Sequence, residues 1–257
     1  MEYFIIAIAA FATALLTFFS GFGLGTILLP VFAVFFPVDV AIALTGVVHF
    51  ANNIFKIALV GRNTDNGVLL RFGLPAFFAA FGGAWVLLQI TGLPVLYQYE
   101  LWGRLFEVTT VKVIIALLLI VFSLAELSPA VNKIQFGKDK LFIGGVLSGF
   151  FGGLSGMQGA IRSAFLIKSG LSKEAYIGTG VAIACLVDFS RLSVYASRFV
   201  SAQLHENAAL LTIAILSAVS GAFFGNRMLR KVTYRSIQTL VAIMLMLLSV
   251  ALGMGLI

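Results

Sequence analysis

The chain consists of ten apolar segments separated by short polar stretches, five segments in each half. They cover residues 3–19, 26–36, 41–60, 67–91 and 108–128, then 141–155, 160–169, 175–195, 207–227 and 236–257. Hydrophobic residues make up 61% of the chain and charged residues 11%, against roughly 45–50% and about 25% in soluble domains. Apolar runs of about 20 residues are typical of membrane-spanning helices. The sequence therefore predicts an all-α polytopic membrane protein.

The two halves resemble each other in sequence. When Gly25–Val48 is placed over Gly159–Ala182 without a gap, Thr45-Gly46-Val47 falls on Thr179-Gly180-Val181. Internal repeats of this kind are common in transporter folds. We therefore divide the chain into a first transmembrane repeat (1–128), a cytoplasmic linker (129–140) and a second transmembrane repeat (141–257).

The second segment of each half is too short to cross a bilayer. A helix of about 10 residues spans about 15 Å, whereas the hydrocarbon core is about 30 Å thick. We expect the first two segments of each half to form a re-entrant hairpin that turns at its glycines, in Ser20–Gly25 and Gly152–Gly159. Three full spans follow each hairpin, giving ten helical segments, six of them full spans. Each half then crosses an odd number of times, so the second repeat has inverted topology.

The basic residues indicate the orientation. With an N-terminus outside, the hairpin arrangement places twelve Lys and Arg residues at the cytoplasmic side, four outside and Arg162 within the membrane, the outer four being Arg104, Lys112, Arg191 and Arg198. Eight single crossings would divide them eight against eight. Because basic residues favour cytoplasmic loops, we expect a plasma (inner) membrane protein with both termini outside. The same distribution accounts for the net charge of +7 without nucleic acid as a partner.

Two hairpins that enter from opposite faces bring their glycine-rich tips together near the midplane. Irregular backbone is tolerated at that depth only inside protein or beside a water-filled cavity. A short helix begins at each tip, and its first N–H groups and dipole favour an anion. We therefore expect an anion site that includes Gly23, Gly25, Thr26, Gln158, Gly159 and Ala160. Alternatively, the glycines only allow close helix packing, for which the G-x-x-x-G spacing of Gly149 and Gly153 is suited.

Charged residues interrupt the apolar segments of both halves. An intramembrane arginine such as Arg162 is a functional candidate suited to carboxylate or sulfonate groups, or else a structural partner of Asp188. Asp188 either couples proton movement to transport or pairs with Arg191 three residues away. We expect the side chains of Arg191 and Lys56 to reach the outer and cytoplasmic surfaces, respectively.

Uncharged polar residues interrupt the segment 41–60. His49 and Asn52 share one helix face. His49 is either a hydrogen-bonded packing residue or a proton relay, and Asn52 is a candidate for lining the substrate pathway. Thr45 and Thr179 occupy matched positions in the two halves, where each either bonds its own helix backbone or contacts substrate.

At the glycine-rich stretches the chain resembles the sulfite exporter TauE/SafE family, also called the 4-toluene sulfonate uptake permeases. Members carry a pattern G-x-G-G-G-x-[IL]-x-x-P near the start of each half, and the first copy here is Gly21–Pro30. In the second copy, Gly156–Ala164, Gln158 and Arg162 interrupt the pattern and Ala164 replaces the proline. The resemblance implies a secondary transporter of sulfite, sulfonates or related sulfur-containing anions, often directed outward. The departures leave the particular substrate open.

These features together predict a transporter of a small anion that works by alternating access and couples to a proton or cation. A passive anion channel, a transporter of small carboxylates and a structural subunit are the alternatives. The chain contains no H-E-x-x-H motif, nucleophile elbow or carboxylate cluster, so we expect no enzyme activity. Two histidines and one cysteine offer too few ligands for a metal site, and we expect no cofactor.

Overall fold

The computed structural model describes residues 1–18, 23–128, 136–201, 204–228 and 234–257. Within these ranges each predicted segment contains one helix of eight residues or more. They are α1 (Glu2–Leu16), α2 (Leu24–Ala33), α3 (Val38–Val60), α5 (Leu74–Thr91), α6 (Thr110–Leu127), α8 (Leu141–Ser155), α9 (Gly159–Leu166), α10 (Lys173–Ser201), α11 (Leu204–Met228) and α12 (Tyr234–Gly253). Shorter turns are η1 (Gly61–Asn63), α4 (Asn66–Val68), the π-helical η2 (Leu69–Gly73) and η3 (Lys138–Lys140).

Four helical stretches are long and apolar enough to cross a membrane among the described residues: Val38–Asn63, Asn66–Thr91, Lys173–Ala196 and Asn207–Arg227. The helices α2 and α9 have only 10 and 8 residues, about 15 and 12 Å of helix. Both are too short for a hydrocarbon core of about 30 Å. The short length predicted for the second segment of each half is therefore confirmed, and the re-entrant hairpins stay a prediction.

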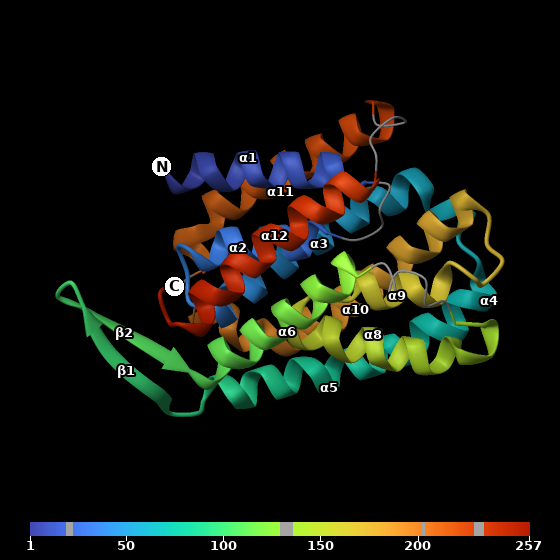
Figure 1. Cartoon of the computed structure of the whole chain (residues 1–257). Coiled ribbons are helices and arrows are strands. Elements are labelled where there is room, and N and C mark those ends of the chain that lie inside the picture. Colours follow the sequence, from blue (N-terminus) through green and yellow to red (C-terminus); the bar gives the residue numbers. More distant parts are fainter. Residues whose placement is uncertain (19–22, 129–135, 202–203, 229–233) are drawn as a thin grey trace.

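A two-stranded antiparallel sheet corrects the all-α prediction. Strands β1 (Val95–Leu101) and β2 (Arg104–Thr109) join α5 to α6. The turn between them has positive φ at Trp102 and Gly103, as a type I′ hairpin turn requires. Figure 1 shows the hairpin extending beyond the helices at the end of the molecule where both termini lie. The sequence reading missed it because it treated residues 92–107 only as a link between spans.

The helices pack in pairs that join the two halves. Helix α1 lies along α11, α5 along α8, α3 along α10 and α6 along α12. The short helix α2 contacts α1 and α3, and the short helix α9 likewise contacts α8 and α10. Figure 1 shows α2 and α9 surrounded by the longer helices. The start of α2 at Gly23 and the irregular segment before α9 are thereby held inside the bundle, as peptide groups at membrane depth require.

Glycines allow the closest of these helix contacts. Gly145, Gly149 and Gly153 lie four residues apart along α8; Gly145 faces Phe72 of η2, and the other two face α5. A Cβ at Gly149 would overlap the carbonyl oxygen of Ala76, so only glycine fits. The packing interpretation of the pair Gly149 and Gly153 is confirmed.

Part of the predicted arrangement lies outside the described residues. This part comprises residues 20–22 of the first hairpin tip and residues 129–135 of the predicted linker. The predicted domain boundaries accordingly stay predictions.

The glycine contact between α5 and α8 predicts a specific loss of stability. Gly149→Ala should lower the stability of the detergent-solubilised protein by about 1–3 kcal/mol, because backbone must shift to admit the methyl group. Gly82→Ala is the matched control, since a Cβ at that exposed position of α5 meets nothing within 4 Å. The melting temperature measures both effects, and equal values for the two variants would contradict the packing described here.

Candidate functional site

The two glycine-rich tips meet inside the helix bundle. Gly23 caps the start of α2 with φ 113°, and Gly156 ends α8 with φ 81°. Both angles lie in the left-handed region that favours glycine. A Cβ placed on Gly25 would lie 3.6 Å from the carbonyl oxygen of Gly156 and 3.7 Å from Cδ2 of His49. Segments separated by about half the chain thus approach within van der Waals contact.

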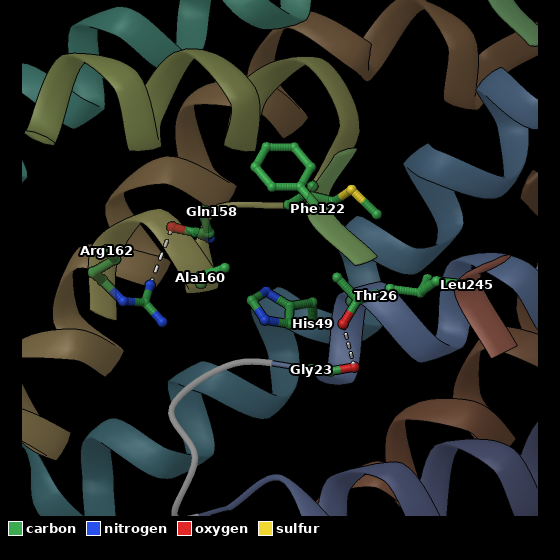
Figure 2. A pocket seen from close by; sticks show the side chains of 12 residues that line it. Gly23, Thr26, His49, Phe122, Gln158, Ala160, Arg162 and Leu245 are labelled. Carbon is green, nitrogen blue, oxygen red and sulfur yellow. Dashed lines mark hydrogen bonds between the residues drawn. The ribbon is translucent and has the colours of Figure 1, made fainter. Parts of the chain in front are cut away.

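A small cavity of about 20 Å³ lies between these tips. Figure 2 shows the start of α2 on one side and the Gln158 segment on the other, with His49 between them. The cavity is lined by the predicted residues Gly23, Gly25, Thr26, His49, Gln158, Gly159, Ala160 and Arg162, and also by Phe122, Gly156, Met157 and Leu245. A cavity of this size has room for about one water molecule. The conformation described here is therefore closed around the site.

Three of the lining residues escaped the sequence reading. Phe122 comes from α6, Leu245 from α12, and Met157 from the second tip. Phe122 and Leu245 are apolar residues within long apolar helices, so nothing in the sequence distinguishes them from residues that face lipid. Met157 stands between Gly156 and Gln158, and its position in the tip was the available signal. These side chains form the apolar part of the cavity wall.

Polar groups at the tips are aimed into this cavity. The hydroxyl of Thr26 donates a hydrogen bond to the carbonyl oxygen of Gly23 at 2.9 Å. Arg162 donates from Nη1 to Oε1 of Gln158 at 3.2 Å, which holds both side chains beside the cavity. The other amide atom of Gln158, Nε2, has no hydrogen-bond partner, and Gln158 is only 2% exposed. A buried donor left unpaired in this way is a candidate ligand-binding group.

Asp188 is the centre of a buried polar cluster next to the cavity. Its Oδ2 lies 2.6 Å from Nδ1 of His49 and accepts a hydrogen bond from Nδ2 of Asn53 at 3.2 Å. Its Oδ1 accepts hydrogen bonds from Nε and Nη2 of Arg191 at 3.0 and 2.8 Å. The cluster joins α3 to α10. The predicted local pairing of Asp188 with Arg191 is confirmed.

Arg191 does not reach the outer surface, and that prediction was wrong. Its side chain is fully buried because the Asp188 carboxylate holds it inside the bundle. Its Nη1 has no hydrogen-bond partner. A Cβ on Gly156 would lie 2.6 Å from this nitrogen, so Arg191 links the Asp188 cluster to the second tip. Its spacing of three residues from Asp188 was the signal for this role.

The remaining candidates lie away from the cavity. Thr179 accepts a hydrogen bond from the backbone N–H of Asp65 at 2.9 Å and so secures the turn after α3. The Thr45 hydroxyl and both amide atoms of Asn52 are buried without a hydrogen-bond partner. Lys56 is only 5% exposed, so its predicted position at the cytoplasmic surface was wrong. Its ammonium lies 5.2 Å from the ring centroid of Phe18, which provides a favourable cation–π contact.

The described residues contain no group of three or more His, Cys, Asp or Glu side chains that could hold a metal ion. The chemical resources of the site are therefore guanidinium, amide and imidazole groups together with the exposed backbone of two helix starts. Such groups bind oxyanions through charge-assisted hydrogen bonds.

Comparison with known proteins places the chain in a family. The family model described as "Sulfite exporter TauE/SafE" matches residues 6–252, nearly the whole chain. The matched range includes both glycine-rich tips, the four candidate spans and every residue that lines the cavity. Neither the curated proteins nor the solved structures yield a match. The chain belongs to the TauE/SafE sulfite exporter family, a family of membrane transporters.

Proposed function

We propose that this protein is a secondary transporter, working as an exporter, that binds a small sulfur oxyanion such as sulfite or a sulfonate between its two hairpin tips. The observation that carries the proposal is the meeting of the tips around a cavity beside Arg162 and the unpartnered amide of Gln158. Family membership supports an anion of this class and outward transport. Several donors around one cavity suit a ligand with three oxygen atoms.

The balance of buried charge supports a multiply charged anion. The buried charged side chains of the described residues are Lys56, Arg162, Arg191 and Asp188. Among these side chains three cations face one carboxylate. Uncompensated charge inside a membrane protein is costly, and a bound dianion such as sulfite would neutralise the excess. A monoanion, whether a sulfonate or the alternative small carboxylate, would neutralise only half of it, so the charge balance favours sulfite among these ligands.

The closed cavity favours a transporter over a passive channel. A channel needs a continuous aqueous path, whereas this cavity has room for about one water molecule. Sulfite is larger than water, so the walls must move before it can bind. In alternating access the two halves shift around a central site. Saturable uptake of sulfite into proteoliposomes would support the transporter and contradict a channel.

The helix pairing supports the proposed inverted repeat of 1–128 and 141–257. In the repeat, α1 corresponds to α8 and α5 corresponds to α11. When each helix is replaced by its counterpart, the contact of α1 with α11 becomes the contact of α8 with α5. The same exchange leaves the pairs α3 with α10 and α6 with α12 unchanged. Such symmetry is the pattern that alternating access by rocking repeats requires.

We further propose that the His49–Asp188 pair couples anion movement to protons. The pair is buried, its atoms are 2.6 Å apart, and His49 also lines the cavity. A proton that enters the pair adds positive charge beside the tips and strengthens anion binding. By linkage, a bound anion also raises the proton affinity of the pair.

Arg162→Ala should weaken sulfite binding. The variant loses a charge-assisted interaction worth about 1.5–3 kcal/mol, which corresponds to roughly a 10- to 150-fold rise in Kd. The Kd of Arg162→Lys should lie between those of the unaltered protein and Arg162→Ala, because lysine keeps the charge but cannot form the bidentate hydrogen bonds of a guanidinium. Titration calorimetry on the purified protein measures both.

Arg71→Ala is the matched control for this change. It removes the same charge from an exposed position outside the cavity, so its Kd should equal that of the unaltered protein. An unchanged Kd for Arg162→Ala in a protein that melts normally would remove Arg162 from the site.

Asp188→Asn should flatten the pH dependence of anion affinity. For the unaltered protein, affinity for methanesulfonate should rise as the pH falls, because a proton gained by the pair adds positive charge beside the tips. Methanesulfonate keeps one charge throughout, so the change reports the protein alone. Besides its direct partners, the Asp188 carboxylate interacts electrostatically with three other side chains, Arg162, Cys185 and Tyr195.

His49→Gln provides the second variant for this test, since Asp188→Asn also strands the buried Arg191. The His49→Gln variant keeps the Asp188–Arg191 pair, and its affinity for methanesulfonate should also be independent of pH. A profile that retains its full slope in both variants would exclude this pair as the coupling group.

The proposed orientation places both termini and the β1–β2 hairpin outside. In a Cys185→Ser background, a cysteine at Gly103 should react with a membrane-impermeant maleimide in intact cells. A cysteine at Lys138, which is also exposed, should react only after permeabilisation. The reverse pattern would invert the proposed topology.

A further inference from the structure

Helix α3 carries a continuous polar stripe that continues beyond the central cavity. Its members occur at helical spacing and are all buried: Thr45, His49, Asn52, Asn53 and Lys56. Spacings of three, four and seven residues place side chains on one helix face. His49 lines the cavity, and Lys56 follows seven residues later toward η1, about 10 Å further along the helix. A polar stripe buried in an apolar bundle is costly unless a ligand or water uses it.

Lys56 lacks a balancing charge. No carboxylate lies within 4 Å of its ammonium among the described residues, where Asp188 provides the only ion pairs. Its cation–π contact with the Phe18 ring offsets only part of the cost of burying a cation. The guanidinium of Arg162 lies close enough to repel it. Two buried cations that repel each other create a position where an anion is favoured.

Asn52 supplies a second, independent observation. It lies one helical turn before Lys56 and is fully buried, yet neither its Nδ2 nor its Oδ1 has a hydrogen-bond partner. Buried amides in native proteins are nearly always paired. An anion beside Lys56 would accept from Nδ2, and the ammonium could donate to Oδ1. One ligand would thus satisfy both otherwise unpaired groups.

We propose that Lys56 and Asn52 form a second binding position for a small oxyanion, on the η1 side of the central cavity. This inference rests on the proposed transport function and deepens it. In the proposed orientation the position lies between the cytoplasm and the hairpin tips. The anion is captured there first and then passes along the α3 stripe to Arg162 and Gln158. The excess positive charge of the core is therefore divided between two positions.

Sulfite titration of the purified full-length protein tests the second position. The unaltered protein should bind two equivalents, and Lys56→Met should bind one, with the central Kd changed less than threefold. Asn52→Leu, which keeps the volume and removes the unpaired amide, should also lose the second equivalent. Lys138→Met is the matched control, because it removes an exposed lysine outside both positions, and it should bind two.

Transport separates a binding role from a structural one. In proteoliposomes Lys56→Met should raise the KM for sulfite at least tenfold from the η1 side and leave the KM from the other side unchanged. Lys56→Arg should retain most of the sulfite affinity measured from the η1 side. It replaces Lys56→Met as the test variant if the methionine variant does not fold. One equivalent in the unaltered protein, or unchanged values in all the variants, would overturn the second position. No sulfite binding by the unaltered protein would instead overturn the proposed function.

Discussion

The need to satisfy every peptide group inside a bilayer determines how this protein is built. Lipid offers no hydrogen bonds, so backbone that leaves the helical path must be enclosed by protein. The start of α2 at Gly23 and the break before α9 are enclosed by helices that pair across the two halves. Two helix starts thereby lie beside one cavity, and the first N–H groups of a helix have no partner within it. The site exists because the fold must bury these breaks.

Glycine serves this architecture in two physically distinct ways. Along α8, Gly145, Gly149 and Gly153 bring backbones into contact, and the role is set by the absence of a side chain. At the tips, Gly23 and Gly156 adopt left-handed φ, and the role is set by conformational freedom. Of the two sequence alternatives, packing is confirmed along α8, whereas ligand approach at the tips stays a proposal. Spacing alone could not separate them, because both kinds occur within one short stretch.

The apolar pattern predicted the ten main helices, including the two short ones, because segment length and hydropathy are local properties of the chain. The same pattern missed the β1–β2 hairpin, because the hairpin residues were assigned to a loop between two spans. It also predicted much of the cavity, since the glycine-rich tips are visible in the sequence. The positions of individual side chains were harder to predict than the helices. The side chains of Arg191 and Lys56 are long enough to reach a surface. The structure shows that Arg191 stays inside because it pairs with the Asp188 carboxylate. It also shows that the ammonium of Lys56 packs against the Phe18 ring.

Buried charge connects the fold to its proposed use. A protein selected only for stability would pair each intramembrane cation or omit it, because breaking a buried pair costs about 3–5 kcal/mol. Here one carboxylate serves Arg191 and His49, while Lys56 has no carboxylate among the described residues. That imbalance is destabilising when the protein is empty and relieved when an anion binds. In the proposed path, an anion that moves from Lys56 to Arg162 relieves the two positions in turn, so the same imbalance that destabilises the empty protein would retain the ligand within the membrane.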